Sequence, residues 1–253
     1  MLLRLYNSSL YKIFLFTFYI IMLTCVSAYF PVKNKHDNKY LKWFENTLSI
    51  NCPYVFFTNS KYIDIIKKYR KHLPTYYVDC EIEDFFTYKY RNQMITHQIH
   101  CPSVELNLIW NEKIFMIKKA YEINPFNSEW FQWIDAGICT YRDNLPPNIT
   151  FPNINKLNLF PKDKFIYSSS NEYINNLVTK TNYYHHISGT SYLIHKSLIN
   201  RFVDIYQLYL DKLVDKDNIW TDQLLLTHIH KDNPDLFFKL CDGYGEIVKY
   251  LFT

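Results

Sequence analysis

One short segment constrains the fold of this chain more than any other: the mainly apolar run at residues 131–134 stops abruptly at Asp135. A small residue, Ala136, and one of only four glycines, Gly137, come next. Such a run is typical of a buried strand in a parallel sheet that helices cover on both faces. In these sheets ligands bind beyond the carboxyl ends of the strands, where a glycine lets another group approach the backbone. The segment therefore predicts a carboxylate at a ligand-binding edge; the alternative is an Asp that only caps a turn.

Composition narrows the class of protein. The 253 residues are 48% hydrophobic, which is ample for a folded core and argues against disorder. A net charge of +4 is mild and does not indicate a nucleic-acid-binding protein, which usually has a clustered basic face. The densest basic stretch, residues 67–72, is interpreted as a solvated helix end. Six scattered cysteines without a C-x-x-C pair argue against a zinc ribbon and a disulfide scaffold.

Strand and helix patterns alternate along the chain. Short apolar runs predict strands, and apolar residues at helical spacing predict helices between them. Expected strands are residues 23–30, 54–57, 76–78, 131–134, 165–167 and 192–194; expected helices begin near Asp37 and span residues 60–70, 103–123, 198–213 and 221–230. Residues 83–100 are expected to form a loop over a site, and residues 143–163 a long connection. This alternation predicts an α/β protein with a mostly parallel sheet flanked by helices.

The amino terminus has several interpretations. Residues 13–30 carry no charge, so they resemble a signal sequence or a short membrane anchor. We favour a third interpretation, an apolar leader at residues 1–22 followed by one domain at residues 23–253, because the fold otherwise lacks its opening strand. The leader is compatible with a weak association with a membrane. The location of the protein therefore has three alternatives: the cytoplasm, a membrane surface or, given the glycosylation sequon at Asn148, a secretory lumen.

Two later places share the character of the Asp135 segment. Gly189 lies between a histidine pair and a predicted strand, as where a backbone passes close to a ligand. Thr221 is suited to cap a helix, which puts Asp222 and Gln223 in its first turn. Complementing the helix dipole is the simpler explanation for Asp222 taken alone. The pairs His185–His186 and His228–His230 point apart on a helix, so neither makes a metal site by itself.

The pattern as a whole resembles the HtrL/YibB family, also called the WlaTC/HtrL glycosyltransferase-like family. The most specific block runs from Cys101-Pro102-Ser103 through Trp110, Lys113 and Asn124-Pro125 to Trp133-Ile134-Asp135-Ala136-Gly137. Weaker blocks lie at residues 24–30, 40–44, 189 and 221–223, so the resemblance covers residues 22–240. It implies a nucleotide-diphospho-sugar transferase of the GT-A type with a Rossmann-like sheet.

The resemblance also implies roles for individual residues. Asp135 matches the aspartate that holds a divalent metal, Mn²⁺ or Mg²⁺, against the donor diphosphate. The usual motif is D-x-D, and its second aspartate is Gly137 here. Because such a metal normally needs several protein oxygens, Asp135 either holds it with help from elsewhere or contacts sugar hydroxyls directly. Asp222 with Gln223 is similar to a D-Q pair near the reacting sugar, as base in an inverting mechanism or charge stabiliser in a retaining one.

Binding residues follow from these positions. For the donor we expect contacts from Tyr29, Arg91, Lys113, Asp135, Ala136 and Gly137. For the acceptor we expect contacts from His186, Gly189 and Thr190. The positive charges of Lys113 and Arg91 would stabilise the departing diphosphate. The structural alternatives are that both are ordinary surface cations and that Tyr29 packs in the core.

We therefore expect a glycosyltransferase that moves a sugar from a nucleotide donor to a glycan or lipid-linked acceptor. The alternatives are a catalytically inactive relative that binds sugar or nucleotide, because the second aspartate is missing, and a membrane-attached interaction protein. The enzyme interpretation makes a geometric prediction: Asp135 and Asp222 should lie across one crevice, at the carboxyl ends of strands.

Overall fold

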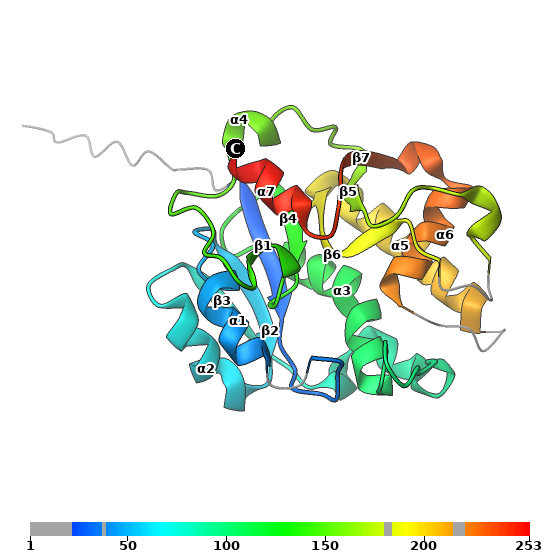
Figure 1. Ribbon diagram of the computed structural model, residues 1–253, viewed down its shortest axis with the longest axis horizontal. Coiled ribbons are helices and arrows are strands. Elements are labelled where there is room, and N and C mark those ends of the chain that lie inside the picture. Colours follow the sequence, from blue (N-terminus) through cyan, green and yellow to red (C-terminus); the bar gives the residue numbers. More distant parts are fainter. Residues whose placement is uncertain (1–21, 37–38, 180–183, 215–220) are drawn as a thin grey trace, which may run out of the picture.

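A seven-stranded sheet forms the centre of the molecule, with the strand order β3-β2-β1-β4-β6-β5-β7. The computed structural model describes residues 22–36, 39–179, 184–214 and 221–253 (Figure 1). The strands are β1 (Leu23–Ala28), β2 (Tyr54–Thr58), β3 (Thr75–Asp79), β4 (Trp130–Ile134), β5 (Phe165–Ser169), β6 (Ile187–His195) and β7 (Phe237–Asp242). Four neighbouring pairs are parallel, whereas β6 runs antiparallel to both β4 and β5. The predicted α/β architecture with a mostly parallel sheet is confirmed.

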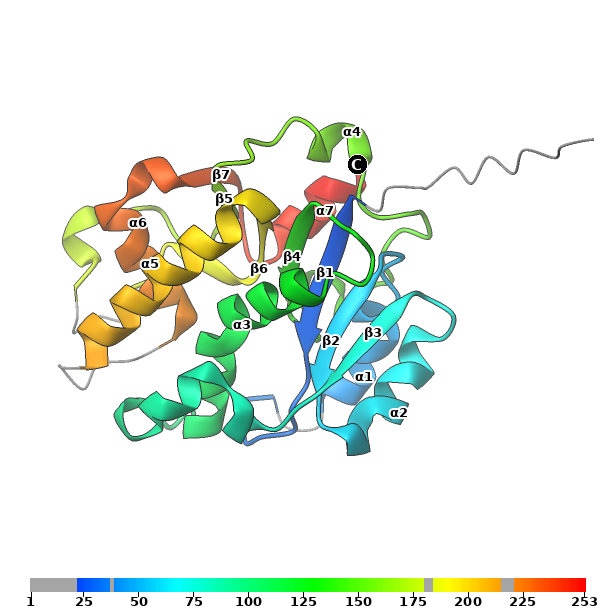
Figure 2. The same cartoon turned by 180° about the vertical axis from the view of Figure 1, so that it is seen from behind.

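Helices cover both faces of the sheet. One face carries α1 (Lys39–Thr47), α2 (Ser60–Arg70) and α7 (Glu246–Phe252); the other carries α3 (Val104–Ile123), α5 (Lys196–Val214) and α6 (Asp222–Asp232) (Figures 1 and 2). Shorter elements are η1 (Ile82–Asp84), η2 (Phe86–Gln93), η3 (Cys139–Tyr141), α4 (Ile154–Leu157), η4 (Asn175–Leu177) and η5 (Pro234–Leu236). Among the described residues, no helix is both long and apolar enough to cross a membrane.

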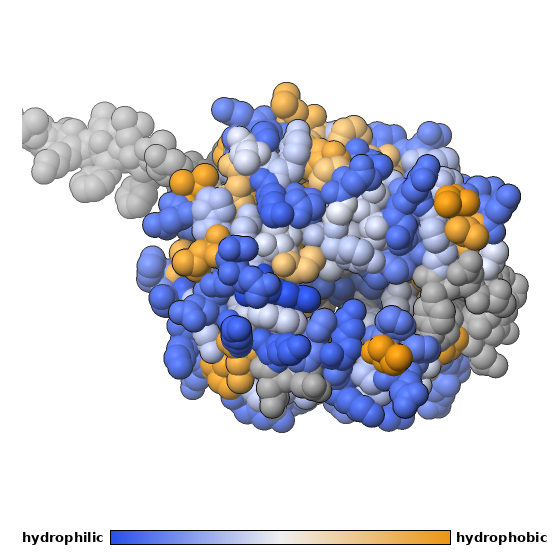
Figure 3. Space-filling view, viewed as in Figure 1, coloured by the Kyte–Doolittle hydropathy of each residue, from blue (hydrophilic) through white to orange (hydrophobic). Residues whose placement is uncertain are grey.

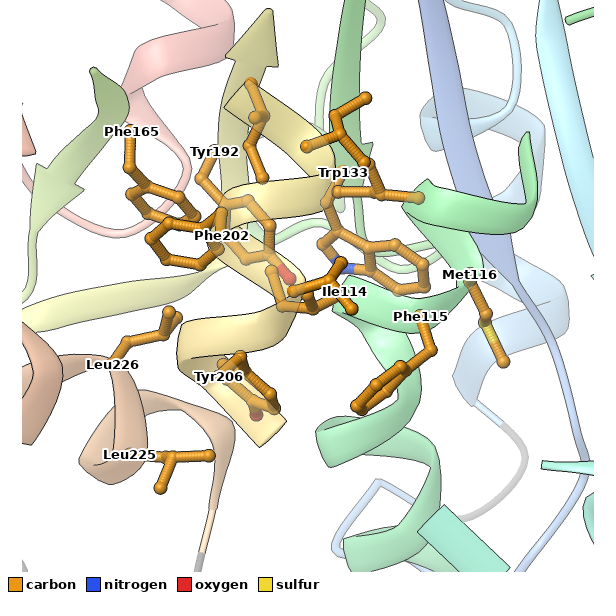
Figure 4. Close-up of a cluster of buried hydrophobic side chains, with 14 of the residues drawn as sticks. Ile114, Phe115, Met116, Trp133, Phe165, Tyr192, Phe202, Tyr206, Leu225 and Leu226 are labelled. Carbon is orange, nitrogen blue, oxygen red and sulfur yellow. The ribbon is translucent and has the colours of Figure 1, made fainter. Parts of the chain in front are cut away.

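The sheet has a hydrophobic core on each face because successive side chains of a strand point to opposite sides. In β4, Phe131 and Trp133 pack with the core under α3, α5 and α6, whereas Trp130 and Ile134 pack with the opposite core. Figure 4 shows Trp133 in the first core beside side chains of α3, α5 and α6. Both faces of β4 are therefore buried, as its apolar sequence predicts. The face shown in Figure 3 is mostly hydrophilic, with small separate apolar patches.

Helix boundaries follow local sequence signals. Ser103 caps α3 by accepting a hydrogen bond from the Leu106 amide at 3.2 Å, and Asn124 ends this helix in the left-handed conformation. Thr221 caps α6 through the Leu224 amide at 3.4 Å, so the predicted cap is confirmed. The first strand is also confirmed. The expected cap at Asp37 and leader residues 1–21 lie outside the described part of the chain.

Two sequence interpretations need correction. The basic stretch at residues 67–72 is not entirely a solvated helix end, because Arg70 is fully buried and donates to the carbonyls of Leu48, Ile50 and Cys52. The strand β7 and the helix α7 were not predicted. Strand β7 is an edge strand with several exposed side chains and thus lacks a clear apolar pattern.

The strand order creates a crevice beside β1. From β1 the chain moves outward to β2 and β3, and it then returns to the other side of β1 with β4. Loops that leave the carboxyl ends of β1 and β4 therefore diverge, which is the arrangement that opens a ligand site in α/β sheets. Asp135 is the first residue after β4, at this point of divergence.

Candidate functional site

Lys113 lies at the centre of the site. It projects from α3 with a side chain that is only 4% exposed. Its Nζ lies 3.1 Å from Asp135 Oδ1 and 3.1 Å from Asp222 Oδ2, and it donates a hydrogen bond to the Gly189 carbonyl at 2.9 Å. Burial opposes the charge of Lys113, but the two carboxylates together outweigh it and raise the pKa of this lysine. The alternative of an ordinary surface lysine is wrong.

The Asp135 carboxylate contacts the side chains of Trp133 and Lys113 and does not cap a turn. Its Oδ1 accepts a hydrogen bond from Trp133 Nε1 at 2.7 Å in addition to the ion pair with Lys113. The Asp135 amide donates to the Thr190 carbonyl at 2.9 Å, which ties the end of β4 to β6. The carboxylate is 30% exposed, so a ligand can reach it.

Asp222 occupies the first turn of α6 and is much deeper, with a side chain only 3% exposed. Burial raises the pKa of Asp222 to about 6; the Lys113 ammonium opposes this shift and the Asp135 carboxylate adds to it. The prediction that Asp135 and Asp222 face one crevice is confirmed, because both line the same cavity. The prediction that both stand at strand ends holds for Asp135 only, because Asp222 begins α6.

Gly189 permits this close assembly. A Cβ atom at this position would lie 2.6 Å from Asp222 Oδ2 and 2.7 Å from Gln223 Cγ. The Gly189 amide instead donates to Gln223 Oε1 at 3.0 Å, and its carbonyl receives Lys113. The sequence predicts that another group approaches the backbone at Gly189 closely, and in the structure that group is the first turn of α6.

A cavity of about 710 Å³ opens above these residues. Its walls come from loops after β1 and β4, from the segment before α3, and from β6 and α6. The predicted residues that line it are Lys113, Asp135, Gly189, Thr190, Asp222 and Gln223. The expectation that residues 83–100 cover a site is confirmed at one end, where His97 and His100 contribute to the wall.

Other predicted residues do not line the cavity. Tyr29 packs edge-on against Phe44 with ring centroids 4.8 Å apart, which matches its core alternative. Arg91 is exposed on η2 and pairs with Glu105 at 3.5 Å. Ala136 is buried, and its carbonyl accepts a hydrogen bond from Thr47.

Gly137 and His186 are also predicted site residues that do not line the cavity. A Cβ at Gly137 would lie 2.8 Å from the Tyr40 ring, so the position has no room for a second aspartate. His186 is buried, bonded to the Tyr167 hydroxyl at 2.9 Å and to the Asn171 carbonyl at 2.7 Å. Its neighbour His185 lines the cavity instead, because adjacent residues point in different directions.

Several cavity residues had no signal in the sequence. Lys35 and His36 follow β1, Arg142 follows η3, and Tyr244 lies between β7 and α7. Tyr40 of α1 also lines the cavity, although its sequence pattern indicates only a helix face. Arg142 is held in place by a hydrogen bond from Nε to the Gly137 carbonyl at 2.9 Å and by stacking 4.0 Å above the Trp43 ring. Only the fold brings these distant segments together, so no local motif marks them.

The expected divalent metal would compete with Lys113 for the same oxygens. Mn²⁺ and Mg²⁺ need several free oxygens, and Mg²⁺ requires contacts of about 2.0–2.1 Å. Here Asp135 Oδ1, Asp222 Oδ2 and the Gly189 carbonyl oxygen all contact the ammonium of Lys113. In the part of the chain that the structure describes, no cluster of three or more His, Cys, Asp or Glu side chains could hold a metal ion.

Comparison with known proteins places this site inside a recognised sequence family. A family model described as "Bacterial protein of unknown function (HtrL_YibB)" matches residues 79–247. This match contains Lys113, Asp135, Gly189 and Asp222, whereas β1 and α1 lie outside it. No curated protein matches the chain.

Proposed function

We propose that this chain, which belongs to the HtrL_YibB family of unknown function, is a GT-A-type glycosyltransferase. It would transfer a sugar from a nucleotide-diphosphate donor to a glycan or lipid-linked acceptor. One observation carries the proposal: a buried lysine and two carboxylates meet in a cavity at the carboxyl ends of β1 and β4. Crevices at this place in α/β sheets are where nucleotides and related ligands bind.

The cavity has a suitable size and wall for such a donor. Pockets for small ligands usually measure about 300–1,000 Å³, and a volume of about 710 Å³ lies within that range. The cations Lys35 and Arg142 line it and would neutralise a diphosphate. The rings of Tyr40 and Trp110 also line it and would stack on a base or sugar. These four residues replace Tyr29 and Arg91 as donor contacts.

The two carboxylates differ in access, which suggests different roles. Asp135 is 30% exposed and would accept hydrogen bonds from sugar hydroxyls. Asp222 is almost fully buried and already contacts Lys113, so an acceptor hydroxyl would not reach it easily. We assign Asp222 to stabilising positive charge on the sugar rather than to removing a proton from the acceptor.

Donor binding tests the proposal directly. A panel of nucleotide sugars is titrated against the protein by thermal shift and calorimetry, with matched variants Lys35→Met and Lys33→Met. Lys35 lines the cavity, whereas the equally exposed Lys33 does not. One class of nucleotide sugar should bind, and Lys35→Met should weaken it about tenfold or more through loss of a charge-assisted hydrogen bond. Absence of binding across the panel, or equal effects of both variants, would contradict the donor site.

A catalytically inactive binding protein is the second candidate. It is favoured by the missing carboxylate at Gly137, where the Tyr40 ring leaves no room for a side chain. Both candidates predict donor binding, but only the enzyme predicts release of a nucleoside diphosphate. Turnover therefore separates the two.

A further inference from the structure

The ammonium of Lys113 occupies a position that resembles a cation site. Three oxygens from three different elements surround it: Asp135 after β4, Asp222 on α6 and the Gly189 carbonyl on β6. An ammonium has three hydrogens to donate, and three oxygens lie 2.9, 3.1 and 3.1 Å away. Carboxylate and carbonyl oxygens are also the ligands that hard divalent cations prefer.

The charges favour a single cation at this place. Asp135 and Asp222 supply two negative charges, and Lys113 already compensates one of them inside the protein. A divalent ion among the same oxygens would lie within a few ångströms of the ammonium and would be repelled by it. The lysine is confined as well, because its side chain is buried and its Nζ lies 5.5 Å from the centre of the Trp133 ring.

We propose that Lys113 is a resident cation that takes the place of a divalent metal between Asp135, Asp222 and the Gly189 carbonyl. The consequence rests on the proposed function: the site binds its nucleotide-sugar donor without a metal. Lys113 is then a positioning residue, because its ammonium contacts protein oxygens. The donor diphosphate is left to Lys35 and Arg142.

Metal binding to the protein alone tests this inference without any donor. Mn²⁺ is titrated by calorimetry against the wild-type protein, Lys113→Ala and the control Lys118→Ala, a more exposed lysine on the same helix that pairs with Glu122. Wild type and Lys118→Ala should bind no Mn²⁺ saturably. Lys113→Ala should gain one site, with a dissociation constant of about 0.1–1 mM expected for a weak oxygen site. A merely structural lysine would not give this gain.

Two further variants keep the test decisive. Adding Asp135→Asn to Lys113→Ala should abolish the new site, which locates it. If Lys113→Ala does not give a cooperative thermal transition, Lys113→Met retains the apolar stem and is titrated instead. Saturable Mn²⁺ binding by wild type that Asp135→Asn removes would overturn the inference. So would a folded lysine variant that gains no site.

Chelation adds an arm with the donor present. The affinity of wild type for its nucleotide sugar should be the same in EDTA and in Mn²⁺. A tenfold or greater loss in EDTA would overturn the resident-cation proposal while supporting the donor site. If no nucleotide sugar binds under either condition, the proposed function fails, and the Mn²⁺ titration still decides the role of Lys113.

Discussion

At the scale of single residues, the site depends on the lack of a side chain at Gly189 as much as on the charged groups of the site. The missing side chain allows the Asp222 carboxylate and the Gln223 amide to approach β6. Lys113 can contact both carboxylates only because β6 and α6 are this close. The geometry of a charged cluster is thus set by one backbone position.

Gly189→Ala tests this dependence. The added methyl group would overlap Asp222 and Gln223, and overpacking of this kind typically costs about 1–3 kcal/mol. We expect a lower free energy of unfolding in urea and a clear loss of donor affinity. Unchanged stability together with unchanged donor binding would show that α6 does not rely on this contact.

Asp222 gives the site a distinct dependence on pH. Its pKa is raised to about 6 in the folded protein, whereas an unperturbed Asp has a value of about 3.9. Between these values the folded state binds more protons than the unfolded chain, so the Asp222 contribution to stability falls as pH rises. The contribution is fully present below about pH 4 and is lost through about pH 6.

The matching measurement compares wild type with Asp222→Asn in urea at several pH values. The stability of wild type relative to the variant should fall by about 2 kcal/mol between pH 4 and pH 7. Burial lowers the pKa of His230 to about 4, but this residue titrates in both proteins and cancels in the difference. A difference that stays constant with pH would contradict the raised pKa of Asp222.

The charged residues of the site could be predicted from the sequence, whereas their burial and their neighbours could not. Asp135, Asp222 and Gln223 were found because each stands where an apolar or helical pattern starts or stops. His186 is the predicted acceptor contact, but it bonds to Tyr167, and its neighbour His185 lines the cavity. No sequence pattern shows which of two neighbouring histidines points inward. The burial of Lys113 was also not predictable from the sequence, since it comes from the approach of α6 and of the Gly189 backbone to α3.

At the scale of elements, Arg70 joins the end of α2 to the loop between α1 and β2. Its guanidinium donates to the carbonyls of Leu48 at 2.8 Å, Ile50 at 2.9 Å and Cys52 at 2.6 Å. It also lies 4.0 Å above the Tyr54 ring. Arg70 and the three residues whose carbonyls it contacts are all almost fully buried. The contact is on the amino-terminal side of β2, away from the cavity.

Arg70→Met should therefore destabilise the fold without altering the site. Leaving buried carbonyls unpaired costs about 1–3 kcal/mol each, so we expect a loss of at least about 3 kcal/mol in urea unfolding. Lys68→Met on the exposed side of α2 is the matched control and should stay within about 0.5 kcal/mol of wild type. Folded Arg70→Met should retain wild-type donor affinity; loss of affinity without loss of stability would contradict this assignment.

Strong periodicity made most elements predictable, and its absence explains those that were missed. The boundaries of α2 agree with prediction, and those of α3 agree to within one residue, because polar caps and a Pro or positive-φ position mark their ends. Strand β7 lies at the edge of the sheet and the short helix α7 packs beside it, so more than half of their residues are exposed or partly exposed. Their place is fixed by contacts with β5 and β6 that are distant in sequence.

At the scale of the whole molecule, the strand order explains why the site lies where it does. The order in which strands are added to the sheet reverses beside β1, and helices cover both faces. The diverging loops therefore leave a cavity that polar groups from distant segments line. This order was not predictable from local patterns, which gave strands but not their neighbours. We propose that this cavity binds a nucleotide sugar and that the protein breaks the glycosidic bond between the sugar and the diphosphate.

Release of the nucleoside diphosphate measures that claim most directly. The donor that binds most tightly is incubated with wild type, Asp135→Asn and the control Asp64→Asn, whose side chain is 92% exposed on α2. Water or an added acceptor glycan takes the sugar. Wild type and Asp64→Asn should release diphosphate at equal rates, and Asp135→Asn should fold normally yet lose about two to three orders of magnitude, as expected for a lost transition-state contact of roughly 3–4 kcal/mol. Wild-type turnover by Asp135→Asn would contradict the account, and binding without any release would favour the inactive relative.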